Sequence, residues 1–86
     1  MSSPLTPEIY AAAARSIGWP PIARISPSDL LFLIARHRLT IDGVGDYLLV
    51  RQSGNVGHVE RVGADRGVAL FNAVVMCAAM IGGVGR

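Results

Sequence analysis

The stretch from Gly67 to Gly85 constrains this chain most, because its nineteen residues contain no charge and only one strongly polar side chain, Asn72. A helical period of about 100° per residue divides the stretch into two faces, and both are apolar. One face holds most of the larger side chains: Val68, Leu70, Phe71, Val74, Val75, Ala78 and Ile81. The opposite face holds smaller or more flexible ones: Ala69, Asn72, Ala73, Met76, Cys77, Ala79 and Met80. The sequence therefore predicts a helix that is covered on most sides.

The rest of the chain must build a single domain around this helix, since 86 residues lie near the lower end of the lengths that fold alone. A hydrophobic content of 51% with only 16% charged residues indicates a packed globule. All eight basic residues are arginine. The chain therefore lacks a phosphate-loop lysine, a Schiff-base lysine and a lysine general base, which excludes several classes of enzyme.

Cysteine usage and the first residues favour a cytoplasmic location. Cys77 is the only cysteine, so neither an intrachain disulfide nor a cysteine zinc site is expected. Its apolar surroundings are typical of a thiol that packs as a small hydrophobe. The segment MSSPLTPE has neither the basic residues nor the apolar core of a signal peptide. We therefore expect a cytoplasmic protein.

The first predicted helix runs from Pro7 to Ile17. Thr6 is a suitable N-cap, and proline fits the first helical position. A run of four alanines continues the helix. Gly18 can adopt the left-handed conformation that ends many helices, and the Pro-Pro pair that follows prevents continuation.

A second helix is predicted from Leu30 to about Leu39. Ser26 and Asp29 have the spacing of a capping box, in which each side chain bonds the backbone of the other residue. The main apolar stripe of this helix consists of Leu30, Leu33, Ile34 and His37.

The middle of the chain predicts β structure. Residues 47–52 and 56–62 are β-prone and form a predicted hairpin with its loop at 53–55. Residues 39–41 are a candidate for a short third strand, and residues 41–46 predict a loop because their glycines are spaced for turns. A two-stranded ribbon is marginal by itself, so the hairpin must pack on the helices.

These elements predict a single α+β domain over residues 1–86. Asp65 is the expected N-cap of the last helix. The predicted order is helix, helix, β-hairpin, helix, with the apolar C-terminal helix at the centre.

No motif predicts catalysis, a cofactor, a metal or a small-molecule substrate. The glycine clusters at 43–45, 54–57 and 82–85 lack the context and spacing of a dinucleotide-binding loop. Asp42 and Asp46 are too few for a calcium loop. The two histidines have no evident nucleophile beside them in the sequence, so a catalytic triad is not expected.

Nucleic-acid binding is an alternative function. Two helices followed by an arginine-bearing ribbon resemble the general layout of winged-helix DNA readers, which is an architectural analogy and not a family match. The residues that would contact nucleic acid are Arg36, Arg38, Arg51, Arg61 and Arg66. Acidic residues are interspersed with these arginines, and the second helix has almost no side chains that read base edges.

A tail-anchored membrane protein is a second alternative, because Gly67 to Gly85 just reaches spanning length. Its many alanines and glycines make it only moderately hydrophobic. A core helix is therefore favoured over a membrane span.

The leading prediction is a non-enzymatic binding protein that works through protein–protein contacts, as an inhibitor, an accessory subunit or a homo-oligomer. Small proteins of this size class are often encoded by phages or bacterial mobile elements. Two candidate partner surfaces follow from apolar side chains outside the expected core: Phe32, Arg36 and Leu39, and Ala73, Met76 and Met80. The loop residues 53–55 are a secondary neighbour of the first of these surfaces. An equally weighted alternative is that the last helix or the segment around Trp19 covers this side of the second helix, including Phe32.

Overall fold

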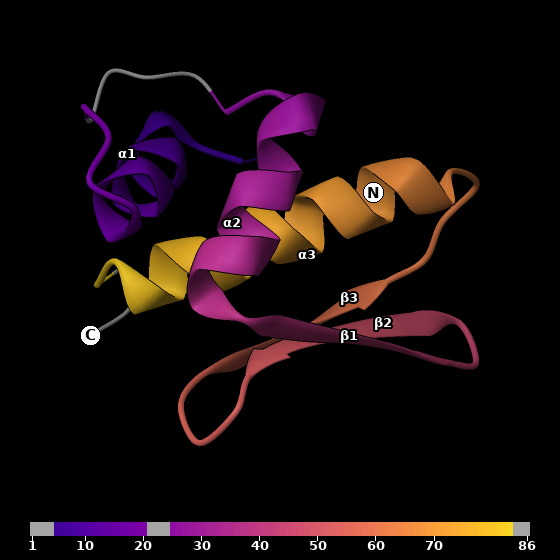
Figure 1. Ribbon diagram of the computed structural model, residues 1–86. Coiled ribbons are helices and arrows are strands. Elements are labelled where there is room, and N and C mark those ends of the chain that lie inside the picture. The colour runs from indigo at the N-terminus through magenta and orange to yellow at the C-terminus, as the bar shows by residue number, and fades with distance from the viewer. Residues whose placement is uncertain (1–4, 21–24, 84–86) are drawn as a thin grey trace.

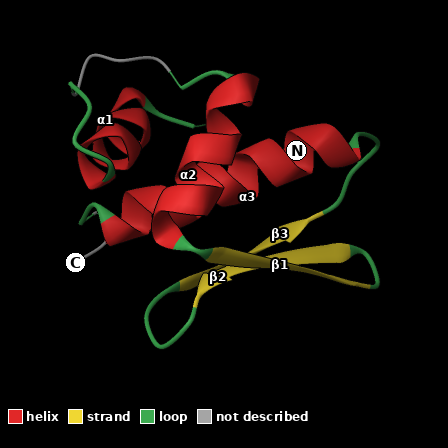
Figure 2. Ribbon diagram, in the orientation of Figure 1, coloured by secondary structure: helices red, strands yellow, loops and turns green. Residues whose placement is uncertain are grey.

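The chain folds into a layer of helices packed on one face of an antiparallel sheet (Figure 1). The computed structural model describes residues 5–20 and 25–83. The helices are α1 (Pro7–Ser16), α2 (Leu30–His37) and α3 (Arg66–Ile81), and the strands are β1 (Leu39–Val44), β2 (Tyr47–Gln52) and β3 (Gly57–Arg61). These helices all lie on the same face of the sheet, and no described helix covers the other face (Figure 2). The predicted α+β fold and element order are confirmed.

The capping residues place α1 within one residue of its predicted bounds. The side chain of Thr6 accepts a hydrogen bond from a backbone N–H of the first turn at 3.2 Å. The helix ends at Ser16, and Gly18 adopts a φ of +78°. The backbone N–H of Trp19 then donates to the carbonyl oxygen of Ala14 at 2.9 Å, which satisfies a carbonyl of the last turn.

The second helix begins as predicted but ends earlier. The backbone N–H of Ser26 donates to Oδ2 of Asp29 at 2.8 Å within the capping box, and a short 3-10 turn leads into α2. The predicted end at Leu39 is wrong, because α2 ends at His37 and Arg38 takes a left-handed φ of +53°. This residue turns the chain directly into β1, so Leu39 is the first residue of a strand.

The sheet has β2 at its centre, with β1 and β3 antiparallel on either side. The hairpin of β2 and β3 confirms the prediction. The predicted loop at 41–46 is wrong for its first four residues, because pairing between β1 and β2 extends as far as Val44 opposite Tyr47. Only Gly45 and Asp46 remain for the turn, and the glycine supplies its positive φ of +59°.

The last helix lies at the centre of the fold, as predicted, and contacts α1, α2, β2 and β3. Its N-cap is Asp65, whose Oδ1 accepts hydrogen bonds from the next backbone N–H groups at 2.8 and 3.2 Å. Both apolar faces of α3 are covered by the chain itself, since Ala73 and Val74 are fully buried although they belong to opposite faces. The prediction that Ala73 contacts a partner is therefore wrong.

Close contact between α1 and α3 depends on small residues. Ala12, Ala13 and Ala14 are fully buried in the same core as the small residues of α3. Immediately after α3, Gly82 passes so close to α1 that an added Cβ would overlap the carbonyl oxygen of Ala12. The face of α3 that carries its small side chains (Ala69, Ala73, Cys77 and Ala79), which we call the small face, thus serves as a packing surface for α1 within the domain.

Candidate functional site

A cluster that we call the α2 patch lies on the outer side of α2. It consists of the exposed helix residues Leu31, Phe32 and Arg36 and of the half-buried Trp19, which follows α1. Leu31 is 74% exposed and Phe32 is 61% exposed. The rings of Phe32 and Trp19 lie 6.0 Å apart between centroids with a tilt of 58°. Trp19 therefore covers one side of Phe32 and leaves most of it in water. Arg36 is exposed one helical turn further along.

The structure separates the predicted patch residues. Phe32 and Arg36 are exposed, whereas Leu39 is only 8% exposed and belongs to the hydrophobic core. Leu39 does not share their helix face because it starts β1, on the face of the sheet that packs against the helices. Leu31 takes part instead, and the signal for it was its position outside the main stripe of α2. Met76 and Met80 are half-buried on α3.

A second exposed surface is the face of the sheet that points away from the helices, which we call the outer sheet face. Side chains alternate along each strand, so one set faces α3 and the other faces outward. The outward set consists of Thr40, Asp42, Val44, Tyr47, Leu49, Arg51, Val59 and Arg61. Val44 is 66% exposed and Val59 is 57% exposed, with Tyr47 and Leu49 between them on β2. Such a contiguous apolar centre is unusual on a surface without a partner.

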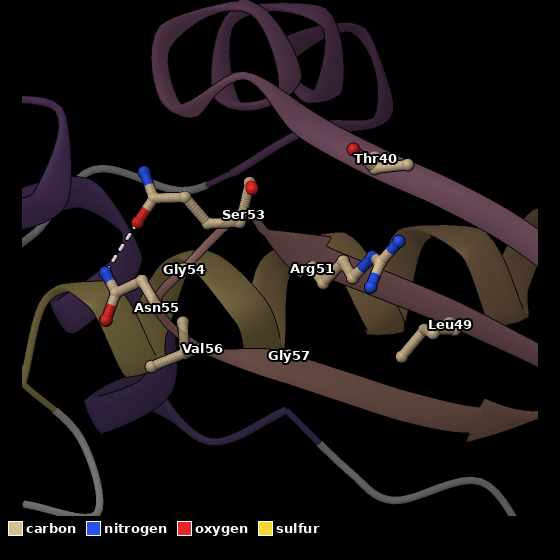
Figure 3. A pocket seen from close by; sticks show the side chains of 9 residues that line it. Thr40, Leu49, Arg51, Ser53, Gly54, Asn55, Val56 and Gly57 are labelled. Atoms are coloured by element: carbon tan, nitrogen blue, oxygen red, sulfur yellow. Dashed lines mark hydrogen bonds between the residues drawn. The ribbon is translucent and has the colours of Figure 1, made fainter.

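One end of the outer sheet face is hollowed, beside the loop between β2 and β3 (Figure 3). The hollow has a volume of about 440 Å³, and its lining includes Thr40, Arg51 and Gly57. Gly57 lies directly opposite Arg51, and an added Cβ there would come within 3.2 Å of the Arg51 Cβ, so the missing side chain helps to form the hollow. In the predicted neighbour loop 53–55, Asn55 donates to Oε1 of Gln52 at 2.6 Å.

The arginines proposed for nucleic-acid binding are distributed over separate elements. Arg36 and Arg38 lie at the end of α2, and Arg66 begins α3. Arg51 and Arg61 lie on the outer sheet face, which points away from the helical layer. Within residues 5–20 and 25–83, none of these arginines forms an ion pair. Arg51 and Arg61 share the outer sheet face with Asp42, away from the arginines at the ends of α2 and α3.

The fold does bring one histidine next to a hydroxyl group. Nε2 of His37 lies 2.8 Å from Oγ of Ser16, but that hydroxyl donates to the carbonyl oxygen of Ala13 at 2.6 Å. Because the serine proton is already used, Nε2 of His37 is the donor in its own hydrogen bond. Burial, followed by the nearby charge of Arg36, lowers the pKa of His37 and keeps the ring neutral. The pair ties α1 to α2 and does not activate the serine as a nucleophile.

The second histidine and two of the carboxylates, Glu60 and Asp65, are also engaged in structural contacts. Nε2 of His58 lies 2.9 Å from Oε1 of Glu60 on the inner face of β3. A hollow of about 350 Å³ between β3 and α3 is lined by Glu60, Asp65 and Asn72 among others. Asp65 caps α3 there, so both carboxylates already have partners. No group of three or more metal-ligating side chains occurs in the described ranges.

Two further observations bear on the class of protein. Among the helices that the structure describes, none combines the length and apolar character needed to cross a bilayer. Comparison with protein-family models, with curated protein sequences and with solved structures found no match to this chain. Function must therefore be inferred from the surfaces of the molecule.

Proposed function

We propose that this chain is a non-enzymatic binding protein that docks onto another protein through the α2 patch. The observation that carries this proposal is the exposure of two adjacent large apolar side chains, Leu31 at 74% and Phe32 at 61%, on a helix whose other side forms core. A helix of a small domain needs only one apolar stripe to hold it in place. A second apolar side is costly in water unless a partner covers it.

The composition of the α2 patch indicates the chemistry of the partner. Tryptophan, phenylalanine and arginine are types that concentrate binding energy in protein interfaces. Phe32 is held from one side by Trp19, so less side-chain entropy is lost when its free side is covered. Arg36, one turn away, has no ion pair among the described residues. The fitting partner surface is an apolar groove with a carboxylate at its edge.

The wider role that we propose is that of an inhibitor or accessory subunit of a larger complex in the cytoplasm, encoded by a phage or a bacterial mobile element. The size of the chain supports this role, because a single small domain offers a docking surface but little room for a deep active site. The lone buried Cys77, which leaves no disulfide within the chain, supports the cytoplasmic location.

The test first identifies the partner by crosslinking from the α2 patch and then measures its affinity for variants of the patch. A photo-crosslinking amino acid is placed at Leu31 in the native host, and in a control at Val68, which is also exposed but lies on α3. A protein that crosslinks from position 31 and not from position 68 is then purified. Its affinity is measured by calorimetry for the wild type, Phe32→Ala, Arg36→Ala and the control Val68→Ala.

We expect Phe32→Ala to weaken binding at least tenfold, or about 1.4 kcal/mol, and Val68→Ala to leave it unchanged. The unfolding free energy of Phe32→Ala should fall by only about 1 kcal/mol, because the ring is mostly exposed, compared with roughly 3–5 kcal/mol for a core phenylalanine. Equal affinities for Phe32→Ala and the wild type would reject the α2 patch as the docking surface.

A further inference from the structure

The outer sheet face is a regular array of three rows that run across the strands. Strand pairing defines the rows: Val44, Tyr47 and Arg61; Asp42, Leu49 and Val59; Thr40, Arg51 and Gly57. Leu49 is at the centre, with Tyr47 beside it along β2, Val59 opposite it on β3 and Val44 diagonally across on β1. Charges occupy the edges, with Asp42 beside the centre on β1 and Arg51 next along β2.

We infer that a second copy of this chain covers the outer sheet face, with the strands of the two sheets crossing at nearly right angles. This inference goes beyond the proposed function and rests on different residues from the α2 patch. Face-to-face sheets pack either nearly aligned or nearly orthogonal, with the inner side chains forming one core. A two-fold interface must in addition be complementary to itself, so each residue must suit the residue that the symmetry places opposite.

The orthogonal arrangement satisfies this condition when the two-fold axis passes through Leu49 along the diagonal from Thr40 to Arg61. Asp42 of each copy then lies over Arg51 of the second copy, which forms two equivalent ion pairs. Leu49 meets Leu49 of the second copy at the centre. Arg61 lies on the axis and meets Arg61 of the second copy, but it does so at a corner of the face, where both long side chains extend into water and their charges are screened.

Shape follows the same symmetry as charge. Val44, at one corner and 66% exposed, is the most exposed apolar side chain of the array. The orthogonal arrangement places it over Gly57 of the second copy, at the hollow that the missing glycine side chain leaves (Figure 3). Tyr47 at the same time lies over Val59 of the second copy. A protruding side chain thus meets a hollow and an aromatic ring meets an apolar side chain, twice each.

The other two-fold arrangements of this array are worse. An axis that runs across the strands places Asp42 against Asp42 of the second copy, and one that runs along β2 places Arg51 against Arg51. Like charges that face each other across an interface are strongly unfavourable. The opposite diagonal places Asp42 over Tyr47 and Arg51 over Val59, which buries charges without partners.

A nucleic acid is the competing occupant of this face, since Tyr47 could stack on a base beside Arg51 and Arg61. The face carries two arginines and one aspartate, and its centre consists of aliphatic side chains. A groove for single strands tracks the phosphate backbone with a stronger positive charge than this. The alternation of charge and the apolar centre favour a second copy.

Charge reversal tests the pairing directly. Sedimentation equilibrium of the full chain over a concentration series measures the dimer dissociation constant for the wild type, Asp42→Arg, Arg51→Asp and the double variant. We expect each single reversal to weaken the dimer at least tenfold, because like charges then face each other twice. The double reversal should restore the wild-type constant to within a few fold. Glu8→Arg, which reverses a charge on α1, should leave it unchanged.

Three sedimentation results would overturn the inference. The wild type stays monomeric up to millimolar concentration, Asp42→Arg does not weaken the dimer, or the double reversal does not restore the dimer. Thermal midpoints measured on dilute monomer show whether a variant has simply unfolded. Binding of a single-stranded oligonucleotide that is lost in Arg51→Asp and absent in the double variant would assign the face to nucleic acid. Phe32→Ala should leave the dimer intact, so this test and the test of the α2 patch fail separately.

Discussion

The last helix and the central strand are both apolar segments, but the fold treats them differently. Beyond its exposed first turn, α3 is packed between other helices on one side and the sheet on the other. β2 is covered on the face that carries Val50 and open on the face that carries Tyr47 and Leu49. α3 lies in the middle of a layered structure, whereas the sheet is its outermost layer (Figure 2). Apolar composition alone therefore does not identify an interface; what matters is whether a layer of the same chain remains to cover the surface.

The largest effect that we expect concerns the small face of α3. If both faces of this helix are covered, Ala73→Glu and Val74→Glu should each lower the unfolding free energy by several kcal/mol, because each buries an unpaired carboxylate. Urea unfolding followed by circular dichroism measures this. A folded Ala73→Glu protein with a midpoint near that of the wild type would mean that the small face is open, and the contrast between α3 and the sheet would disappear.

The contact between α3 and α1 should be sensitive to a single methyl group. Gly82→Ala adds a Cβ where the carbonyl oxygen of Ala12 lies, and no change of rotamer can relieve that overlap. We expect the two helices to move apart with a loss of roughly 3 kcal/mol, at the upper end of ordinary overpacking. Gly63→Ala is the matched control, because nothing lies within 4 Å of its added Cβ. Similar thermal midpoints for the two variants would contradict the close contact.

The two faces of the sheet can be compared with the same substitution. Val50→Ala removes methyl groups from a fully buried position and should lower the unfolding free energy by about 2 kcal/mol. Val59→Ala, on the outer sheet face, should lower it by less than about 0.5 kcal/mol in dilute monomer. Equal losses would show that the outer face is also packed within the monomer.

The smallest effect is a pH dependence from His37. Its folded-state pKa is lowered below 6.5 by burial and by the charge of Arg36, so the unfolded chain binds the proton more readily. Stability from this residue is complete above about pH 6.5 and declines as the pH falls from there toward the lower folded-state pKa. Urea midpoints at a series of pH values should therefore fall on acidification in the wild type and in His58→Gln. The decline should be reduced in His37→Gln; an unchanged decline would assign it to other groups.

Features set by neighbours along the chain were predictable from the sequence. Thr6, Asp29 and Asp65 each bond a backbone group within three residues, so their capping roles follow from local spacing. Gly18 ends its helix for the same local reason. The hairpin of β2 and β3 also depends on a short loop, and its prediction was correct to within one residue at each end.

Features set by distant partners were not predictable. β1 extends to Val44 because β2 offers a pairing edge along its whole length, which overrides the turn tendency of the glycines between 41 and 46. Leu39 was assigned to the wrong side for the same reason, since its burial depends on a strand and not on a helical face. The sequence left open whether Phe32 is exposed or covered by Trp19. In the structure the ring is 61% exposed and contacts Trp19 on one side, and this balance depends on a segment beyond helical range.

Apart from the end of α2 and the extent of β1, the sequence by itself determined the helices, the hairpin of β2 and β3, their caps, their order and the central place of α3, because these depend on side-chain periodicity or on bonds within a few residues. Only the tertiary structure decided which apolar surfaces are core and which remain open. That decision depends on how many layers 86 residues can build: α1 is long enough to cover the small face of α3, and no described element remains to cover the outer sheet face or the α2 patch.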